Sequence, residues 1–264
     1  MDFSHQETWL HHINPSLKLL ILVVLFIQIL MIHNINFLLN ELIGMLILYL
    51  FFTGHPSKRL VLISLPFLLI FLTSSTSMIF FGKGETTWLH WGLVHITEES
   101  FTRGLHLGFR GIVFAVLGVV FALTTRPVFL FYSLMQQLKL KPKFAYSFMA
   151  AVRLLPLMAE EMQTLNHALK VRGVQRKKGI TGFYHKLKSY SIPLLSQSIR
   201  RAHRIAVAME AKRFSEAKSR TYYYRLGFSK YDGLFLIYLL GVTMLAYYMA
   251  VHFPYFSTTD VRYL

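Results

Sequence analysis

Cysteine is absent from this 264-residue chain, and acidic residues are scarce. Without cysteine the chain has no disulfide framework and no thiol chemistry. Only 12 Asp and Glu stand against 28 Lys and Arg, so general acid–base or metal-assisted catalysis has few side chains to use. The sequence also lacks a Walker glycine loop and a nucleophile elbow. We therefore expect a chain that is not an enzyme and that binds no cofactor or metal itself.

Hydrophobic residues are abundant, with a mean hydropathy of +0.46, although the net charge is +16. This combination indicates a membrane protein with a large basic face rather than a soluble nucleic-acid binder. Apolar runs of nearly the ~20 residues that cross a bilayer core occupy 17–32, 35–52, 60–81, 105–123 and 234–251. The sequence therefore predicts an all-α integral membrane protein with about five transmembrane helices.

Basic residues are concentrated between the fourth and fifth apolar runs. Segment 126–230 holds 21 of the 28 Lys and Arg and four Glu, a net charge of +17, whereas loop 82–100 holds one Lys and three Glu. Positively charged segments tend to stay in the cytoplasm. We therefore expect the N-terminus and 126–230 inside the cell, and loop 82–100 and the C-terminus outside.

Three segments follow from this pattern: transmembrane helices 1–4 in 1–125, a cytoplasmic region in 126–230, and a last transmembrane helix with an external tail in 231–264. The cytoplasmic region has its own helical pattern. In order, we expect a short interfacial helix, a long amphipathic helix, a basic turn and a second amphipathic helix, over 127–138, 143–173, 175–179 and 181–214.

The long helix has an apolar stripe of period 3.5 to 3.6 that continues for about eight turns. Four charged residues make it too polar to cross a membrane: Arg153, Glu160, Glu161 and Lys170. Pro142 suits its start, and Gly173 is expected to end it in a left-handed conformation. The stripe is suited to packing against the companion helix or against a partner subunit, and the pattern alone leaves both open.

Both amphipathic helices end in basic residues, Arg172 in the first and Lys212-Arg213 in the second. A basic residue near a helix C-terminus interacts favourably with the helix dipole by about 0.3–1 kcal/mol. One basic end therefore needs no functional explanation. Two matched ends on two matched helices favour a shared function.

Small residues form a ridge along the fourth apolar run, at intervals of four and three residues: Gly104, Gly108, Gly111, Ala115 and Gly118. Such a ridge lets two membrane helices approach closely. It is expected either to pack inside this subunit or to offer a smooth face to a partner. Arg110 lies in the same run, and we expect it to pair with Glu41 or to reach the outer interface.

Three segments resemble the transmembrane T component of energy-coupling factor (ECF) transporters, a family of bacterial vitamin and metal importers driven by ABC-type ATPases. They are HHINPSLKLL, the stretch from FALTTRPVFL to HALKVRG, and RRAHRIAVAMEAKRF. The resemblance implies a multi-pass protein of the bacterial cell membrane with two coupling helices. It also implies three partners, namely two ATPases, which hold ATP and magnesium, and a substrate-binding S component in the membrane.

In that family each coupling helix ends in an X-Arg-X motif whose arginine docks on an ATPase. The first motif carries over as Val171-Arg172-Gly173. The second departs from the pattern, because a gapless alignment puts Lys212 at the arginine and Arg213 at the glycine that often follows it. We favour Arg213, with Phe214 after it, because a planar guanidinium suits carbonyl and carboxylate acceptors.

The resemblance is strongest to T components dedicated to thiamine or its pyrimidine precursor. Two other functions compete with this interpretation. A self-sufficient secondary transporter would need broken helices or an inverted repeat, and the sequence shows neither. A membrane-anchored binder of anionic lipid or nucleic acid would present solvated basic faces, which leaves the two apolar stripes unexplained.

Overall fold

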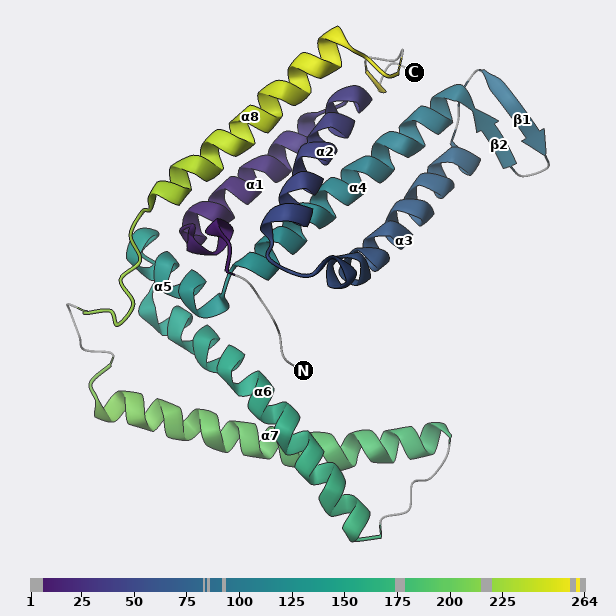
Figure 1. Ribbon diagram of the computed structural model, residues 1–264. Coiled ribbons are helices and arrows are strands. Elements are labelled where there is room, and N and C mark those ends of the chain that lie inside the picture. The colour runs from purple at the N-terminus through teal and green to yellow at the C-terminus, as the bar shows by residue number, and fades with distance from the viewer. Residues whose placement is uncertain are drawn as a thin grey trace. The chain divides into compact units, whose positions relative to one another are not determined.

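The computed structural model describes residues 7–82, 84, 86–91, 94–173, 179–214, 220–256 and 260–261. Its elements are a short 3-10 helix η1 (Trp9–His12), α1 (Pro15–Met31), α2 (Ile35–Phe52), α3 (Ser57–Phe81), β1 (Thr87–Trp91), β2 (Val94–Thr97), α4 (Glu98–Thr124), α5 (Pro127–Gln137), α6 (Pro142–Val171), α7 (Ile180–Ala211) and α8 (Lys230–His252). The predicted all-α membrane architecture is confirmed, with one small hairpin added (Figure 1).

The chain forms two compact units. The first contains residues up to Arg126 and from Leu226 onward, and the second contains Pro127–Arg225. The second unit is therefore one continuous segment inserted between the two segments of the first unit. Two covalent links, at Arg126–Pro127 and Arg225–Leu226, join them.

Four helices in the described part of the first unit are long and apolar enough to cross a membrane: α2, α3, α4 and α8. The 17-residue α1 is a shorter apolar helix beside them. The core of this unit lies among α1, α2, α4 and α8, with fully buried side chains such as Ile29, Leu38 and Val113. Most of the α3 surface is exposed, and this helix packs mainly against α4.

Polar caps determine where several spanning helices begin. The Asn34 side chain accepts hydrogen bonds from the backbone N–H groups of Asn36 and Phe37, which starts α2. Thr97 and Ser100 exchange side-chain and backbone hydrogen bonds, so α4 begins at Glu98 rather than at the first apolar residue of its run. Hydropathy alone placed this start too late, because it does not detect a polar first turn.

The segment before α4 forms an antiparallel hairpin that the sequence pattern did not predict. Strands β1 and β2 pair Leu89 with Ile96 and Trp91 with Val94, and an irregularity follows Thr87. Both strands are short, so their alternating pattern is too brief to stand out from a loop.

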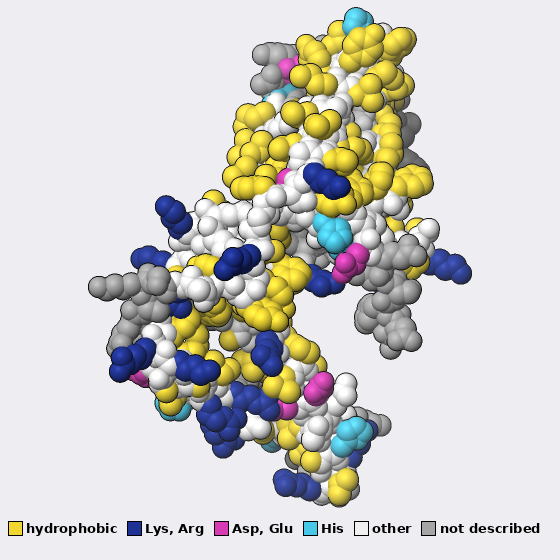
Figure 2. All heavy atoms as spheres, turned by 60° about the vertical axis from the view of Figure 1, so that its left-hand side comes forward, with side chains coloured by type: hydrophobic (Ala, Val, Ile, Leu, Met, Phe, Trp, Pro, Cys, Tyr) yellow, Lys and Arg dark blue, Asp and Glu magenta, His cyan; other side chains and the backbone are white. Residues whose placement is uncertain are grey.

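The second unit contains α5, α6 and α7. Helix α5 packs on the start of α6, and α6 crosses α7 (Figure 1). The predicted basic turn falls mostly on residues 174–178, which lie outside the described residues. In Figure 2 the spanning helices present a surface of hydrophobic side chains, whereas Lys and Arg side chains gather over α6 and α7.

Candidate functional site at the ends of α6 and α7

The end of α6 is built by a glycine in the left-handed conformation, as predicted. Gly173 has φ +67°, and its N–H donates to the Lys170 carbonyl at 3.1 Å. Arg172 is the last residue before this reversal, and its N–H donates to Ala168 at 3.1 Å. Val171 is 89% exposed, so nothing in the described chain covers this face of the end. The helix therefore presents Arg172 on an open tip.

The end of α7 repeats this backbone geometry with different residues. Arg213 has φ +54°, and its N–H donates to Glu210 at 2.8 Å. The next N–H, of Phe214, donates to Met209 at 3.0 Å, which completes a Schellman cap. In backbone terms Lys212 therefore corresponds to Arg172, and Arg213 corresponds to Gly173. Which of the two side chains docks stays a prediction.

Arg213 occupies a conformation that L-residues rarely adopt. A left-handed residue other than glycine costs roughly 1–2 kcal/mol, because Cβ approaches a carbonyl oxygen. Such strain persists where the surrounding structure holds it, and often where the side chain is needed. Position 213 therefore holds an arginine although a glycine would adopt this backbone conformation with less strain.

Aromatic and basic side chains support the α7 end from inside the second unit. The Phe214 ring packs edge-on against Tyr146 of α6, with ring centroids 5.2 Å apart. The Arg220 guanidinium lies over the same ring at 4.1 Å and donates to the Phe214 carbonyl. The sequence interpretation missed both contacts. The run of three tyrosines at 222–224, close to Arg220, was the available sign of an aromatic cluster.

Tyrosines extend this support into the base of α5 and α6. Tyr132 packs against Tyr146, Tyr222 and Tyr224, with ring centroids 5.5–6.4 Å apart. Burial, reinforced by Tyr132, raises the pKa of the Tyr146 phenol. The four rings therefore form one aromatic cluster at the base of α5 and α6.

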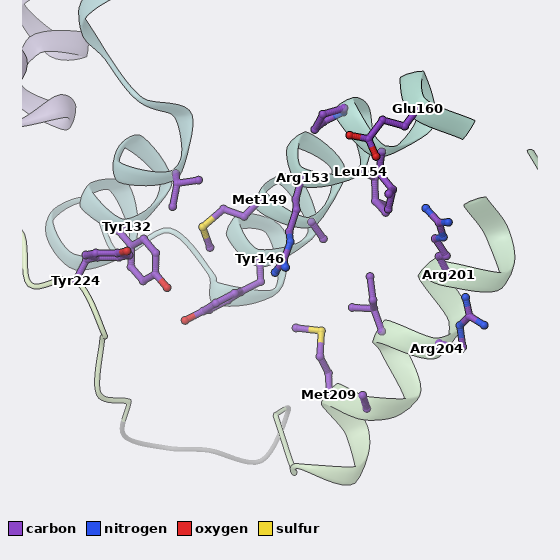
Figure 3. A pocket seen from close by; sticks show the side chains of 16 residues that line it. Tyr132, Tyr146, Met149, Arg153, Leu154, Glu160, Arg201, Arg204, Met209 and Tyr224 are labelled. Carbon is purple, nitrogen blue, oxygen red and sulfur yellow. The ribbon is translucent and has the colours of Figure 1, made fainter. Parts of the chain in front are cut away.

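A groove of about 1050 Å³ lies between α6 and α7 (Figure 3). Tyr132, Tyr146 and Tyr224 line one end of it, and Arg153, Arg201 and Arg204 belong to its polar lining. Much of the remaining lining is aliphatic, including Met149, Leu154, Ile205 and Met209. The groove therefore has a mainly apolar lining that includes three arginine side chains.

Polar contacts hold α6 and α7 together where they cross. Glu161 of α6 forms an ion pair with Arg201 of α7 and accepts a weaker hydrogen bond from Gln197 at 3.4 Å. Nearer the other end of α7, Tyr190 donates to Asn166 at 2.8 Å. These contacts connect α6 to α7 at two places along their lengths.

Much of the apolar stripe of α6 remains uncovered within this chain. Phe144, Phe148, Leu155 and Met162 are each 47–65% exposed. On α7 four apolar side chains are 54–67% exposed: Leu187, Ile192, Leu195 and Ile199. Large apolar side chains exposed on a folded unit in this number are typical of an interface with a protein or a membrane.

The small-residue ridge of α4 divides into two parts. A Cβ at Gly104 would come within 2.9 Å of the Ser75 carbonyl oxygen of α3, and a Cβ at Gly108 would meet the Phe71 ring at 2.5 Å. These two glycines therefore permit the close approach of α3 to α4.

The remaining ridge residues have more space. A Cβ at Gly111 or Gly118 would meet no described atom within 4 Å, apart from those of its own helix and chain neighbours. Ala115, between them, is only partly buried. This part of the ridge, unlike the first, leaves room on its surface.

Arg110 reaches a backbone carbonyl instead of a carboxylate. Its Nη2 donates to the Ile32 oxygen at 2.7 Å, just beyond the end of α1. Both carboxylate oxygens of Glu41 are buried and have no hydrogen-bond partner among the described residues. The pairing of these two side chains, which the sequence allowed, is therefore absent from the described structure. Nor do the described residues contain a cluster of three or more His, Asp or Glu that could hold a metal ion.

Comparison with known proteins identifies the family. The family model CbiQ, described as "Cobalt transport protein", matches residues 6–223. An "energy-coupling factor transporter transmembrane protein EcfT" from Limosilactobacillus fermentum is 30% identical over 261 residues, which cover 92% of this chain and 94% of that protein.

Proteins of the same name in other bacteria are similar over nearly their whole length. The one from Streptococcus thermophilus is 27% identical, with 92% of this chain and 95% of the relative covered. The one from Macrococcus caseolyticus is 24% identical, with 94% and 96% covered. The chain therefore belongs to this family and is a multi-pass protein of the bacterial cell membrane, the T component of an ECF transporter.

Proposed function

We propose that this chain transmits the movements of two ABC-type ATPases to a substrate-binding S component in the membrane. The observation that carries the proposal is the pair of matched helix ends at Arg172 and at Lys212-Arg213. Each end places a basic side chain beside a left-handed turn, on a helix that runs back through the second unit. ATP and magnesium belong to the ATPases in this proposal, and this chain hydrolyses no nucleotide.

The helix ends are suited to docking because their shape is fixed before binding. In both caps the backbone hydrogen bonds close the last turn, so little ordering remains when a partner is bound. A guanidinium inserted into a partly desolvated groove makes charge-assisted hydrogen bonds to carbonyl or carboxylate oxygens. Two ends on one linked ATPase pair also raise each other's effective concentration.

The exposed apolar side chains of α6 and α7 support the second half of the proposal. A membrane-embedded S component offers hydrophobic surface that would cover residues such as Phe148 and Leu155. Gly111 and Gly118 add a smooth strip on α4 along which such a partner can slide. The contacts at Glu161 and Tyr190 join α6 to α7, which suits the two helices to moving together.

The proposed orientation places the N-terminus and both long helices in the cytoplasm and the C-terminus outside. The net charge of +17 in 126–230 supports it, since the ATPases are cytoplasmic and the basic segment stays on their side. Thiamine or its pyrimidine precursor is the proposed substrate. Competition of each compound with uptake by the assembled transporter tests that assignment.

The direct test compares two arginines in the transporter expressed with its ATPases and S component. Arg172→Ala is expected to weaken co-purification of the ATPases and to reduce substrate uptake more severely. Truncating one side of a desolvated charged contact typically costs about 2–5 kcal/mol. Arg200→Ala is the matched control, since Arg200 is an exposed arginine of α7 far from its end. Equal effects of the two variants would contradict docking at Arg172.

A further inference from the structure

A buried lysine connects three separate segments of the first unit. Lys18 is only 3% exposed. Its Nζ donates to the Leu10 carbonyl at 2.7 Å, to the Thr124 hydroxyl at 3.1 Å and to the Thr124 carbonyl at 3.3 Å. A fourth contact reaches the Thr125 hydroxyl at 3.4 Å. The ammonium therefore joins the N-terminal segment to the last turn of α4.

A buried carboxylate makes the corresponding connection to α8. Asp232 accepts hydrogen bonds from the backbone N–H groups of Asn14 and Ser229, both at 2.7 Å. The Asn14 side chain also donates to the Gly227 carbonyl at 3.1 Å. The backbone N–H of Lys18 donates to the Asn14 carbonyl at 3.0 Å, which links the two sets of contacts. We call Asn14, Lys18, Thr124 and Asp232 together the polar clasp.

The clasp stands where the chain leaves the first unit and where it returns. Thr124 lies just before the Arg126–Pro127 link, and Gly227 lies just after the Arg225–Leu226 link. These two links are the covalent connections through which the second unit can pull on the first. The chain next to each link is hydrogen-bonded to the same buried cluster, although more than a hundred residues separate Thr124 from Asp232.

We propose that the polar clasp is the mechanical junction through which movement of the second unit reaches α4 and α8 together. Two independent tethers would absorb a displacement by bending separately. Tethers whose bases are fixed to each other pass the displacement on to both helices at once. This inference rests on the proposed function, because it concerns the route by which ATP-driven movement enters the membrane unit.

The chemistry of the clasp favours a junction over simple packing. Burying groups such as the Lys18 amine and the Asp232 carboxylate costs desolvation free energy, so a purely stabilising role would be met as well by hydrophobic residues. Here the Lys18 and Asp232 side chains form hydrogen bonds with specific backbone atoms of separate segments, which fixes geometry in a way that apolar contacts do not. The clasp also gives a purpose to Asn14 and Lys18, which belong to the N-terminal HHINPSLKLL segment.

The test uses the assembled transporter in liposomes and measures substrate uptake per ATP hydrolysed. Lys18→Met is expected to leave the ATPases bound and hydrolysing ATP while uptake per ATP falls about tenfold, equivalent to about 1.4 kcal/mol. Asp232→Asn, which keeps the side-chain shape, is expected to act in the same direction. The double variant should be no worse than the more harmful single one, since both changes open one cluster. Additive losses would overturn the clasp as a unit.

Tyr49→Phe is the matched control. It removes a buried hydrogen bond of the same unit, from the Tyr49 hydroxyl to the Leu60 carbonyl at 2.8 Å, that involves no residue of the clasp. It is expected to lower stability and leave uptake per ATP unchanged. If Tyr49→Phe uncouples transport as strongly as Lys18→Met, general destabilisation explains the result and the inference fails.

A distance measurement separates this inference from the proposed function. Spin labels on Lys58→Cys in α3 and Gln163→Cys in α6 report the two units in the otherwise cysteine-free chain. Opening the clasp by Lys18→Met should broaden their distance distribution with or without ATPases present. If Lys18→Met yields no folded protein, Asp232→Asn and Thr124→Val carry the same test. An unchanged distribution together with normal uptake per ATP would overturn the clasp, whereas loss of docking at Arg172 concerns the proposed function alone.

Discussion

The ends of α6 and α7 share one backbone geometry but differ in how they are supported. The α6 end leaves Val171 89% exposed and places a glycine in the left-handed turn. The α7 end places an arginine there and ties the next residue, Phe214, to Tyr146 and Arg220. The first end is therefore a free tip, and the second is a braced one. We therefore expect the last turn of α7 to be held more firmly than the last turn of α6.

The largest effect is expected when both ends lose their guanidinium groups. Arg172→Ala combined with Arg213→Ala should release both ATPases and leave the membrane unit folded, because two desolvated contacts of about 2–5 kcal/mol each are lost. Co-purification from gently solubilised membranes measures release, and circular dichroism measures folding. ATPases that still co-purify with the double variant would exclude the helix ends as the attachment points.

The second prediction settles the position of the docking side chain on α7. We expect Arg213→Ala to reduce ATPase binding by about 2–5 kcal/mol and Lys212→Ala to reduce it by less. Lys212 corresponds to Arg172 in the backbone of the two caps, so the alternative is that Lys212→Ala reduces ATPase binding more than Arg213→Ala does. Titration of ATPase into immobilised variants gives both affinities. A larger loss for Lys212→Ala would move the contact by one residue.

The third prediction converts the braced end into a free one. Phe214→Ala removes the ring that Tyr146 and Arg220 contact, and an aromatic pair contributes about 0.5–1.5 kcal/mol beyond its buried area. Amide exchange of the last turn of α7 should then accelerate toward the rate in the last turn of α6. Phe144→Ala is a control, because that ring is 50% exposed on α6. Unchanged exchange in Phe214→Ala would show that the bracing has no effect.

The smallest effects concern the two left-handed residues. Gly173→Ala should destabilise the α6 end by about 1 kcal/mol, since Cβ is disfavoured at φ +67°. Arg213→Gly should raise the free energy of unfolding by about 0.5 kcal/mol. Relief of the backbone strain stabilises the folded state, and the extra conformational entropy of glycine in the unfolded chain offsets part of that gain. The same Arg213→Gly variant should lose ATPase binding. Melting temperatures of the two variants check the stability changes, and ATPase titration of Arg213→Gly checks the loss of binding. A lower melting temperature for Arg213→Gly would show that the left-handed conformation of Arg213 is unstrained.

The spans and the two long helices were predictable because their signals are local. Runs such as 35–52 coincide with α2, and the glycine at 173 ends α6 in the expected conformation. The hairpin and the polar first turn of α4 escaped prediction because both are short and polar. Hydropathy and periodicity report apolar surface, and caps such as Thr97 must be recognised separately.

Features that depend on distant residues were beyond a single sequence. The residue type at position 213 does not indicate a left-handed conformation, because arginine is common inside helices. The contacts of Lys18 with Thr124, and of Asn14 with Asp232, join residues separated by more than a hundred positions. Only the folded chain shows that these four residues meet beside the two links.

Cross-linking from the two helix ends tests the central claim most directly. The chain has no cysteine of its own, so a photoreactive group can be attached at one place only, on Val171→Cys or on Lys212→Cys. Ser196→Cys, exposed in the middle of α7, is the matched control. On illumination of the assembled transporter, the account predicts ATPase adducts from both ends and few from Ser196→Cys. Adducts that are absent at the ends, or equally abundant from the middle of α7, would contradict it.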